Sequence, residues 1–346
     1  MSGCRPDPPV CSPATSGDTL HRRATADGSL TLWSERFGEA FHSGLGAHAE
    51  AIAKFVAPAQ LERFPTGQRL RVLDVCVGLG YNSAALVEAA EDRGLQIAWI
   101  GLELDPRPLG LALADEGFRR LWRTSTLEAL EQLHRDGHWG VRGDGHGEGH
   151  GNDQKSSGGS WLLGDARAQL AAVLERWEGR CDLVLHDAFS PTHCPELWTL
   201  EFLGALARLL NPRGRLLTYC AAAAVRQALQ QAGLQLASIV AASSPDSSPA
   251  AERAGSGDPP RLWCAGTAAS PTPFQGSDDT APCHGAVLRA LSAMEREHLL
   301  SRAGEPYRDP SGNADAATIR SQRSERQRHH TGESTSAWRR RWGLER

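Results

Sequence analysis

The sequence predicts an α/β fold built on a mostly parallel sheet, and three observations lead to this prediction. Residues 70–75 form a short apolar run with β-branched side chains, which is typical of a parallel strand buried on both faces. Gly78 and Gly80 follow as a tight turn, and an Ala- and Leu-rich helical segment begins after Ser83. Further strand and helix patterns then alternate up to about residue 266.

The composition is compatible with one large domain flanked by tails. With 346 residues the chain can bury a sizeable core, and a formal net charge of −4 gives no global nucleic-acid signature. The eight cysteines include no C-x-x-C pair, so we expect reduced thiols. No secretory h-region opens the chain, and no apolar run reaches 18 residues. We therefore expect a soluble, cytoplasmic protein without a membrane span.

The region before the first strand is expected to contain a tail, a β-hairpin and a helix. Residues 1–26 are rich in Pro, Ser and Thr without periodicity, which predicts disorder. After an Asp-Gly turn, alternating segments at residues 30–34 and 36–42 indicate the hairpin. Residues 47–55 then indicate a helix that Pro58 ends.

Polar residues are dense in this N-terminal region, which we delimit at residues 27–60. Ser34 and His42 are the two that we select as candidates for contact with a substrate. A solvated hairpin face explains the same residues equally well.

Two helical segments and a low-complexity insertion follow the second strand. Residues 107–120 and 125–135 have helical patterns, whereas residues 136–160 contain nine glycines and three histidines. Imidazoles are good metal ligands, but no carboxylate or thiol stands at a fixed ligand spacing here. Because glycine-rich chain is entropically costly to order, we expect a flexible surface insertion and no metal site.

Five further strands are predicted after the insertion, at residues 161–163, 181–190, 215–220, 234–240 and 261–266. Helices are expected between them, except before the last strand. There the connection is a Ser-, Pro- and Gly-rich loop over residues 241–260, so the last two strands should pair antiparallel. The main domain is therefore expected to span residues 27–270.

Residues 271–346 are expected to form a linker, a helix and a tail. The helix is predicted over residues 286–303 from its apolar stripe. From Ala316 onwards the chain is dense in arginine, which is typical of an arm that orders on RNA phosphates. Glutamates are interspersed among these arginines and weaken that interpretation.

Acidic residues follow several of the predicted strands, at the edge where parallel strands carry their sites. They are Asp74, Glu103, Asp165 and Asp187. Asp74 precedes the glycine turn, where it would oppose a bound phosphate but would suit a ligand with an amine and a sulfonium. The third glycine of a dinucleotide fingerprint is also replaced, by Ser83.

These features favour S-adenosylmethionine, which carries both cations and no phosphate. Glu103 lies where such folds bind a ribose hydroxyl pair, and Asp165 lies where an acid accepts from the adenine amino group. A glycine turn in an unrelated α/β protein and, for Asp165, a helix N-cap remain the alternatives. Asp187 is the strongest candidate for a reacting residue, because a charge at the end of a buried central strand is costly.

Four stretches of the chain resemble a known family. They are DGSLTLWSERFGEAFHS at residues 27–43, DVCVGLGYNS at 74–83, DAFSPTHCPELW at 187–198 and LLNPRGRLLTYCAAAAVRQALQQAGL at 209–234. The chain is similar there to the tRNA wobble-uridine 5-methylaminomethyl-2-thiouridine methyltransferases, which are the methyltransferase half of MnmC and its stand-alone relatives. The resemblance covers roughly residues 27–233.

The resemblance implies a class I S-adenosylmethionine-dependent methyltransferase fold, a Rossmann-like sheet of seven strands with an antiparallel last strand. It implies methyl transfer to the aminomethyl nitrogen of a tRNA wobble uridine or 2-thiouridine, with Asp187 beside the sulfonium and the incoming amine. By position, the resemblance assigns the cofactor to Asp74, Gly78, Gly80, Asn82, Glu103 and Asp165, and the walls of the base pocket to Phe189, Pro191 and Trp198.

Two parts of the family pattern differ in this chain. No second G-x-G-x-x-G unit follows residue 240, so the flavin oxidase domain is expected to be absent and other enzymes would make the aminomethyl substrate. The glycine-rich insertion and the arginine-rich tail have no counterpart in the shared motifs.

Three alternatives share the predicted fold. A polyamine aminopropyltransferase also brings an amine to a sulfonium but uses decarboxylated cofactor. A methyltransferase acting on a small-molecule or protein amine would not depend on tRNA. A non-catalytic RNA-binding module would have lost cofactor binding. The presence of the acids and glycines assigned to the cofactor argues against this alternative.

Overall fold

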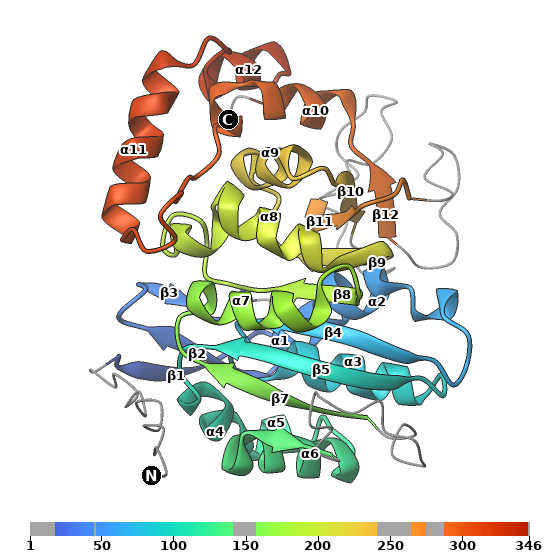
Figure 1. Cartoon of the computed structure of the whole chain (residues 1–346). Coiled ribbons are helices and arrows are strands. Elements are labelled where there is room, and N and C mark those ends of the chain that lie inside the picture. Colours follow the sequence, from blue (N-terminus) through green and yellow to red (C-terminus); the bar gives the residue numbers. More distant parts are fainter. Residues whose placement is uncertain (1–17, 45, 141–156, 241–263, 275–286, 345–346) are drawn as a thin grey trace, which may run out of the picture.

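The computed structural model describes residues 18–44, 46–140, 157–240, 264–274 and 287–344 (Figure 1). Its centre is a nine-stranded sheet with the strand order β12-β10-β11-β9-β8-β4-β5-β7-β6. The five central strands, from β9 to β7, run parallel, whereas β11 pairs antiparallel with both β9 and β10. The strands are β4 (Arg69–Val75), β5 (Gln96–Glu103), β6 (His138–Trp139), β7 (Gly158–Leu163), β8 (Cys181–His186), β9 (Leu210–Thr218), β10 (Gln235–Val240), β11 (Cys264–Ser270) and β12 (Val287–Ala290).

Helices cover both faces of this sheet, and alternate residues of β4 supply the two cores. Leu70 and Val72 pack on one face against α3, α4, α5 and α6, whereas Leu73 and Val75 pack on the other face against α7, α8 and α9. The helices are α3 (Tyr81–Glu91), α4 (Arg107–Leu113), α5 (Glu116–Arg119), α6 (Thr124–Asp136), α7 (Ala166–Trp177), α8 (Leu200–Leu209) and α9 (Ala223–Gln231). This arrangement confirms the predicted class I methyltransferase fold and the antiparallel pairing of β10 with β11. The sheet has nine strands and not the predicted seven, because β6 and β12 pair onto its two edges.

A second, three-stranded sheet precedes the first buried strand and corrects two predictions. Its strands are β1 (Leu20–Ala24), β2 (Leu30–Ser34) and β3 (Glu39–Ala40). β1 lies inside the tail predicted to be disordered at residues 1–26, and it is ordered by antiparallel pairing with β2, which composition does not reveal. Residues 1–17 lie outside the described residues. The second hairpin strand, expected over residues 36–42, is only two residues long because the chain turns at Glu35–Gly38.

The helix predicted over residues 47–55 is longer and irregular. It consists of α1 (Ala47–Ala51), a π-helical turn η1 (Ile52–Val56) and α2 (Ala57–Ala59). Pro58 does not end the helical run, which continues through α2 to Ala59. It ends at Gln60, which has a left-handed backbone with φ 49°.

Several strand and helix bounds also differ from the prediction. The 107–120 helix is interrupted at Asp115, which caps α5 by accepting from the N–H of Phe118 at 2.9 Å. The edges of the 136–160 insertion pair with each other as β6 and β7, while residues 141–156 lie outside the described residues. β9 starts at Leu210, because the expected Asn-Pro turn is accommodated as a register shift against β8.

The C-terminal region was predicted to be a linker, a helix over residues 286–303 and a tail; the helix is present but shorter, and the tail is helical. Residues 287–290 form β12, because they pair with β10 instead of continuing a helix. The helices α10 (Ala293–Leu300), α11 (Ala316–His329) and α12 (Thr335–Arg341) follow. In Figure 1, α10 and α12 lie over α9, and α11 lies on the side to which the arrows of β5 and β7 point. The arginine-rich segment is therefore folded against the domain.

Internal hydrogen bonds use several of the tail arginines. Arg323 donates to the carbonyl oxygens of Ala303 and Glu305, at 3.0 and 2.6 Å. Arg320 donates to the carbonyl of Thr192 at 3.0 Å, in the loop after β8. An arm that orders on RNA phosphates was one interpretation of these arginines; in the structure, Arg320 and Arg323 donate to carbonyl oxygens of the protein itself.

Candidate functional site

The four predicted acids gather at the carboxyl edge of the parallel strands. Backbone hydrogen bonds tie the ends of these strands together: the N–H of Asp187 donates to Val75 at 3.1 Å, and the N–H of Gly164 donates to Glu103 at 2.8 Å. The small sheet β1–β3 lies beside this edge in Figure 1. The strand ends that parallel topology brings together thus form one site.

The turn after β4 has three residues with left-handed backbones: Cys76 at φ 68°, Gly78 at 57° and Gly80 at 89°. A Cβ atom on Gly78 would lie 3.3 Å from Cδ1 of Phe41, so glycine is required there both by conformation and by the close ring. The turn leads directly into α3, whose N-terminus lies at the site.

Glu103 is buried at the end of β5 and is held by backbone amides. The N–H of Gly78 donates to its Oε2 at 2.8 Å, and the N–H groups of Leu104 and Asp105 donate to its Oε1 at 2.7 and 2.9 Å. Burial raises the pKa of Glu103, although these three amides lower it in part. Three of about four acceptor positions are used, which leaves Oε2 able to accept from one further hydroxyl.

Asp74 is fully buried behind the turn. The hydroxyl of Ser83 donates to its Oδ2, whereas its Oδ1 has no hydrogen-bond partner among the described residues. Burial, together with the neighbouring Asp187 and Glu103, raises the pKa of Asp74 to about 7. An unpartnered buried carboxylate oxygen is costly, and it favours a cationic group nearby.

Asp187 follows β8 and is half-buried. The side-chain amide of Asn82, from the first turn of α3, donates to its Oδ2 at 2.7 Å. Burial raises the pKa of Asp187 to about 7, against the lowering effects of Asn82 and Lys54. Asn82 therefore lies against the proposed reacting residue, and Asp187 is poised to change charge near neutral pH.

Phe189 is one member of an aromatic group beside Asp187. The rings of Phe37 and Phe189 stack with centroids 4.5 Å apart, and Phe41 meets Phe189 edge-on at 4.9 Å. Trp198 is fully buried, and its Nε1 donates to the carbonyl of Phe189 at 2.7 Å. Pro191 is also buried. The structure thus places Trp198 and Pro191 beneath the loop that carries Phe189.

Ser34 and His42 lie in the small sheet with most of their polar atoms engaged. Ser34 is fully buried, and its hydroxyl donates to Oδ2 of Asp18 at 2.6 Å. His42 packs edge-on against Tyr81 at 5.2 Å and has Nδ1 3.1 Å from Oγ1 of Thr31. Burial lowers the pKa of His42 to about 4, so the ring is neutral at physiological pH. Ser34 acts within the fold, and the structure does not bring it to Asp187.

Asp165 caps α7, which was the alternative interpretation. Its Oδ1 accepts from the backbone N–H of Arg167 at 2.9 Å, and its Oδ2 pairs with the guanidinium of the same arginine at 2.7 Å. Burial acts to raise the pKa of Asp165, but its bonds to Arg167 leave it below its usual value. The carboxylate remains about half exposed at the edge, so the cap and an adenine contact are compatible.

Sequence reasoning missed several residues that surround Asp187. Glu50 and Lys54 form an ion pair at 3.2 Å, and Nζ of Lys54 lies 5.8 Å from the centre of the Tyr219 ring. Glu39 accepts from the N–H of Ser190 at 2.8 Å and so ties the small sheet to the loop after Asp187. Lysine is otherwise present only at residue 155, and this rarity was the one available signal for Lys54.

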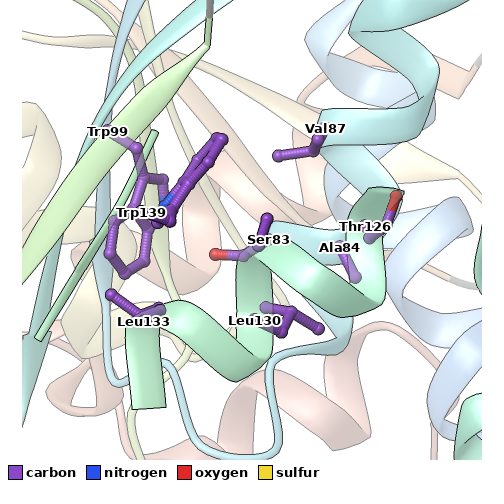
Figure 2. Close-up of a pocket in the computed structure, with 9 residues that line it drawn as sticks. Ser83, Ala84, Val87, Trp99, Thr126, Leu130, Leu133 and Trp139 are labelled. Carbon is purple, nitrogen blue, oxygen red and sulfur yellow. The ribbon is translucent and has the colours of Figure 1, made fainter. Parts of the chain in front are cut away.

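A small apolar cavity lies behind the site, between α3, α6 and the strands. Figure 2 shows it among Trp99, Trp139, Leu130 and Leu133, with Ser83 at its rim. Its volume of about 10 Å³ is at the lower limit of the roughly 10–15 Å³ that a single water needs in the same measure. We interpret it as a packing gap and not as a substrate site.

Two further classes of site can be reported for the part of the chain that the structure describes. Within those residues, no group of three or more His, Cys, Asp or Glu side chains is arranged to hold a metal ion. None of the described helices is both long and apolar enough to span a bilayer.

Comparison with known proteins agrees with this geometry. The sequence model of a family described as S-adenosyl-L-methionine-dependent methyltransferase matches residues 160–242. The tRNA 5-methylaminomethyl-2-thiouridine biosynthesis bifunctional protein MnmC of Acidovorax sp. (strain JS42) is 30% identical over 213 residues, which are 60% of this chain and 32% of that protein. An uncharacterized protein of Methanocaldococcus jannaschii is 28% identical over 60% of this chain and 52% of its own length.

A solved structure covers most of the chain. The crystal structure of MNMC2 from Aquifex aeolicus matches with a TM-score of 0.64 and 25% identity, over 91% of this chain and 87% of that one. The chain spans about a third to a half of the length of the curated relatives named above.

The sheet order, the match to the family model and the likeness to the solved structure together define the class I S-adenosyl-L-methionine-dependent methyltransferase fold. Within that class, the chain is similar to the methyltransferase half of MnmC over about 60% of its own length, and to MNMC2 of Aquifex aeolicus over 91% of it. The residues present fit the cofactor: Glu103 retains an acceptor position for a hydroxyl, and three acids with raised pKa values favour a sulfonium and an ammonium.

Proposed function

We propose that this protein methylates the primary amine of a 5-aminomethyl group on a wobble uridine or 2-thiouridine of tRNA. The product is the 5-methylaminomethyl nucleoside, and a tRNA substrate implies action in the cytoplasm. The observation that carries the proposal is the Asp187 carboxylate, held by Asn82 at the end of β8 beside the glycine turn. The printed names of the MnmC relatives support this choice of substrate.

Asp187 has the position and the charge to handle the amine. A primary alkylamine has a pKa near ~10, so it arrives protonated at neutral pH and cannot attack until it loses a proton. Asn82 occupies Oδ2 of Asp187. The carboxylate can therefore bind the ammonium, orient it and accept its proton as the nitrogen attacks.

The proposed cofactor residues would hold the methyl donor beside Asp187. When bound, S-adenosyl-L-methionine supplies an electrophilic methyl group on a positively charged sulfur. Glu103 would accept from a ribose hydroxyl, Asp165 from the adenine amino group, and the turn at Gly78 and Gly80 would allow close approach of the ligand. In-line orientation of the reacting groups is worth about 7–11 kcal/mol in favourable cases.

The aromatic group at Phe189 would hold the uracil or thiouracil ring. Phe37 stacks on one face of Phe189, and the Phe41 ring packs against it at an interplanar angle of 74°, which fixes the Phe189 ring before a base arrives. A base that stacks on an aromatic ring of this kind gains about 1–3 kcal/mol. The buried Trp198 holds the backbone of Phe189 through its indole N–H.

Methyl transfer to tRNA tests the proposal directly. The assay supplies labelled S-adenosyl-L-methionine and bulk tRNA from cells that lack this protein, followed by nucleoside analysis. Labelled 5-methylaminomethyl uridine, with or without the 2-thio group, is the expected product. Label in no nucleoside, while the cofactor still binds, would reject a tRNA substrate and direct the search to small-molecule or protein amines.

A further inference from the structure

An ion pair on the helical segment before β4 points toward the reacting carboxylate. Glu50 belongs to α1 and Lys54 to η1, one turn later, and Nζ of Lys54 donates to Oε1 of Glu50 at 3.2 Å. The two side chains are only 15% and 20% exposed. Glu50 also accepts from the N–H of Ser43 at 3.3 Å and from its hydroxyl. Both charges are thus largely removed from water and held in place.

Lys54 faces Asp187 across a short chain of contacts. Its Nζ lies 5.8 Å from the centre of the Tyr219 ring, and the Tyr219 hydroxyl donates to the carbonyl of Ala188 at 2.9 Å. Ala188 is the residue after Asp187. Among the described residues, Lys54 forms an ion pair with Glu50, whereas no ion pair with an N–O distance within 4 Å joins Lys54 to Asp187.

The π-helical turn explains why this lysine reaches the site. A π-turn contains an extra residue, so it displaces the side chains that follow it around the helix axis. Phe55 packs into the core, while the neighbouring Lys54 lies at the Tyr219 ring. η1 packs against α3, which carries Asn82, and against β9, which Tyr219 follows. The turn therefore lies over both neighbours of Asp187.

We propose that the Glu50–Lys54 pair positions the acceptor site: Lys54 keeps the Asp187 carboxylate charged, and Glu50 holds Lys54 back from closing onto it. A lysine ammonium that paired directly with Asp187 would occupy the place intended for the substrate ammonium. A neutral residue in its place would leave Asp187 surrounded by like charges. Because Lys54 is near Asp187 but bound to Glu50, the pair supplies a positive charge without filling the ammonium site. This role rests on the proposed amine methylation.

The negative charges near Asp187 explain why a nearby cation such as Lys54 is needed. Asp74 and Cys76 lie at the end of β4, Tyr219 follows β9, and Glu50 lies on α1. Burial raises the pKa values of Cys76 and Tyr219, which are therefore neutral, so the negative charges near Asp187 are those of Asp74 and Glu50. Among the groups that set the pKa of Asp187, Lys54 is the cation, and it lowers that pKa, whereas Glu50 raises it. His42 interacts with both members of the pair but is itself neutral.

The two members of the pair should act on Asp187 with opposite signs. We would label the protein with 13C at the aspartate Cγ and follow the carboxyl signals against pH, without cofactor or tRNA. The signal of Asp187 is identified by its absence in Asp187→Asn. Lys54→Met should raise the titration midpoint of Asp187 by about one pH unit, and Glu50→Gln should lower it.

Two matched variants separate charge from fold. Lys54→Arg keeps the charge and should leave the midpoint unchanged. Arg93→Met removes an exposed arginine that pairs with Glu62 at 3.7 Å, and it should also leave Asp187 unchanged. Identical midpoints in the wild type, Lys54→Met and Glu50→Gln would overturn the proposal. If Lys54→Met does not fold, Glu50→Gln alone decides, because a midpoint that fails to fall rejects the role.

A second readout connects the pair to catalysis. With the Asp187 midpoint raised from about 7 to about 8, the charged fraction at pH 7 falls about fivefold, and kcat/KM for tRNA should fall in proportion and recover near pH 9. A loss of the same size at every pH would indicate a structural role and overturn the proposal. The titration needs no substrate, so it stays readable if the tRNA proposal fails.

Discussion

At the scale of single residues, the site consists of acids whose surroundings differ although their positions are equivalent. Glu103 is bound by three amides, Asp165 by a neighbouring arginine, and Asp187 by one side-chain amide. Only the last combines partial exposure with a pKa raised to about 7. This difference in environment, and not the residue type, selects Asp187 as the group that exchanges a proton.

Asp187→Asn tests that selection. The amide has the shape of the carboxylate and can still accept from Asn82, but it can neither neutralise an ammonium nor accept its proton. We expect kcat to fall about 10²–10⁴-fold in single-turnover methylation of modified tRNA. Cofactor binding, measured by calorimetry, should stay within a few-fold of wild type. Near-normal turnover of the variant would exclude this role.

Asp74 predicts a dependence of stability on pH. Its pKa is about 7 in the folded protein, against about 3.8 in the unfolded chain, so the unfolded state loses this proton first as the pH rises. The resulting loss of stability develops between about pH 4 and pH 7. In Asp74→Asn this loss disappears.

We therefore compare the free energies of unfolding of Asp74→Asn and wild type at two pH values. The variant should be more stable than wild type by a larger margin at pH 8 than at pH 5. The increase in this difference should be on the order of 2 kcal/mol. Urea denaturation of both proteins without cofactor measures it, and Asn still accepts from Ser83, which keeps the local contact. A difference that does not change with pH would show that Asp74 is not strained by its charge.

At the scale of elements, two irregular turns shape the site: the glycine turn after β4 and the π-helical turn η1. The turn after β4 reverses direction within five residues by using left-handed backbones at Cys76, Gly78 and Gly80. The π-turn η1 redirects Lys54 toward the site. Both irregular elements lie at the carboxyl edge of the sheet, where the chemistry takes place.

Gly78→Ala should impair the turn in two ways. The left-handed backbone at φ 57° disfavours alanine by about 1–2 kcal/mol, and the added methyl group lies 3.3 Å from Phe41. We expect lower stability in urea and at least tenfold weaker cofactor binding by calorimetry, because the ring of Phe41 must move.

Gly28→Ala is the matched control. Gly28 has a similar backbone at φ 79°, but nothing lies within 4 Å of an added Cβ. It should lose a similar amount of stability and keep its cofactor affinity. Equal cofactor affinities in the two variants would contradict the steric argument at Gly78.

At the scale of the whole molecule, the C-terminal segment is part of the domain and reaches the edge of the site. Asp309 is 1% exposed and pairs with Arg167 at 2.9 Å, and Arg167 in turn holds Asp165. The N–H of Leu200 donates to the carbonyl of Tyr307 at 2.9 Å. The last part of the chain is thus joined to the loops that follow β7 and β8.

Asp309→Ala should loosen this connection. The change removes the partner of a largely buried guanidinium and leaves the hydroxyl of Ser311 and the N–H of Ala314 without their acceptor. Arg167 still has Asp165 as an ion-pair partner in this variant. We therefore expect the free energy of unfolding in urea to fall by about 1–3 kcal/mol, and hydrogen exchange in α11 to become faster. Asp315→Ala, which removes an exposed N-cap of the same helix, should cost about 1 kcal/mol without affecting the Asp165 edge. Equal effects would mean that Asp309 matters only locally.

The sequence by itself determined seven strands of the main sheet, the antiparallel pairing of the last two of these and the edge at which the acids meet. These follow from local signals: apolar runs, the glycine turn after β4 and the position of each acid at a strand end. The resemblance on the stretch at residues 187–198 then indicated the family, which the comparisons support.

Only the tertiary structure decided which polar residues act together. β1 is ordered by its pairing with β2, β12 joins the sheet because β10 offers it an edge, and the arginine-rich tail folds because its donors find backbone carbonyls. The Glu50–Lys54 pair lies at the Tyr219 ring on a π-turn that no local sequence pattern predicts. Contacts between residues more than a hundred positions apart carry no sequence periodicity, so their partners emerge only when the chain is folded.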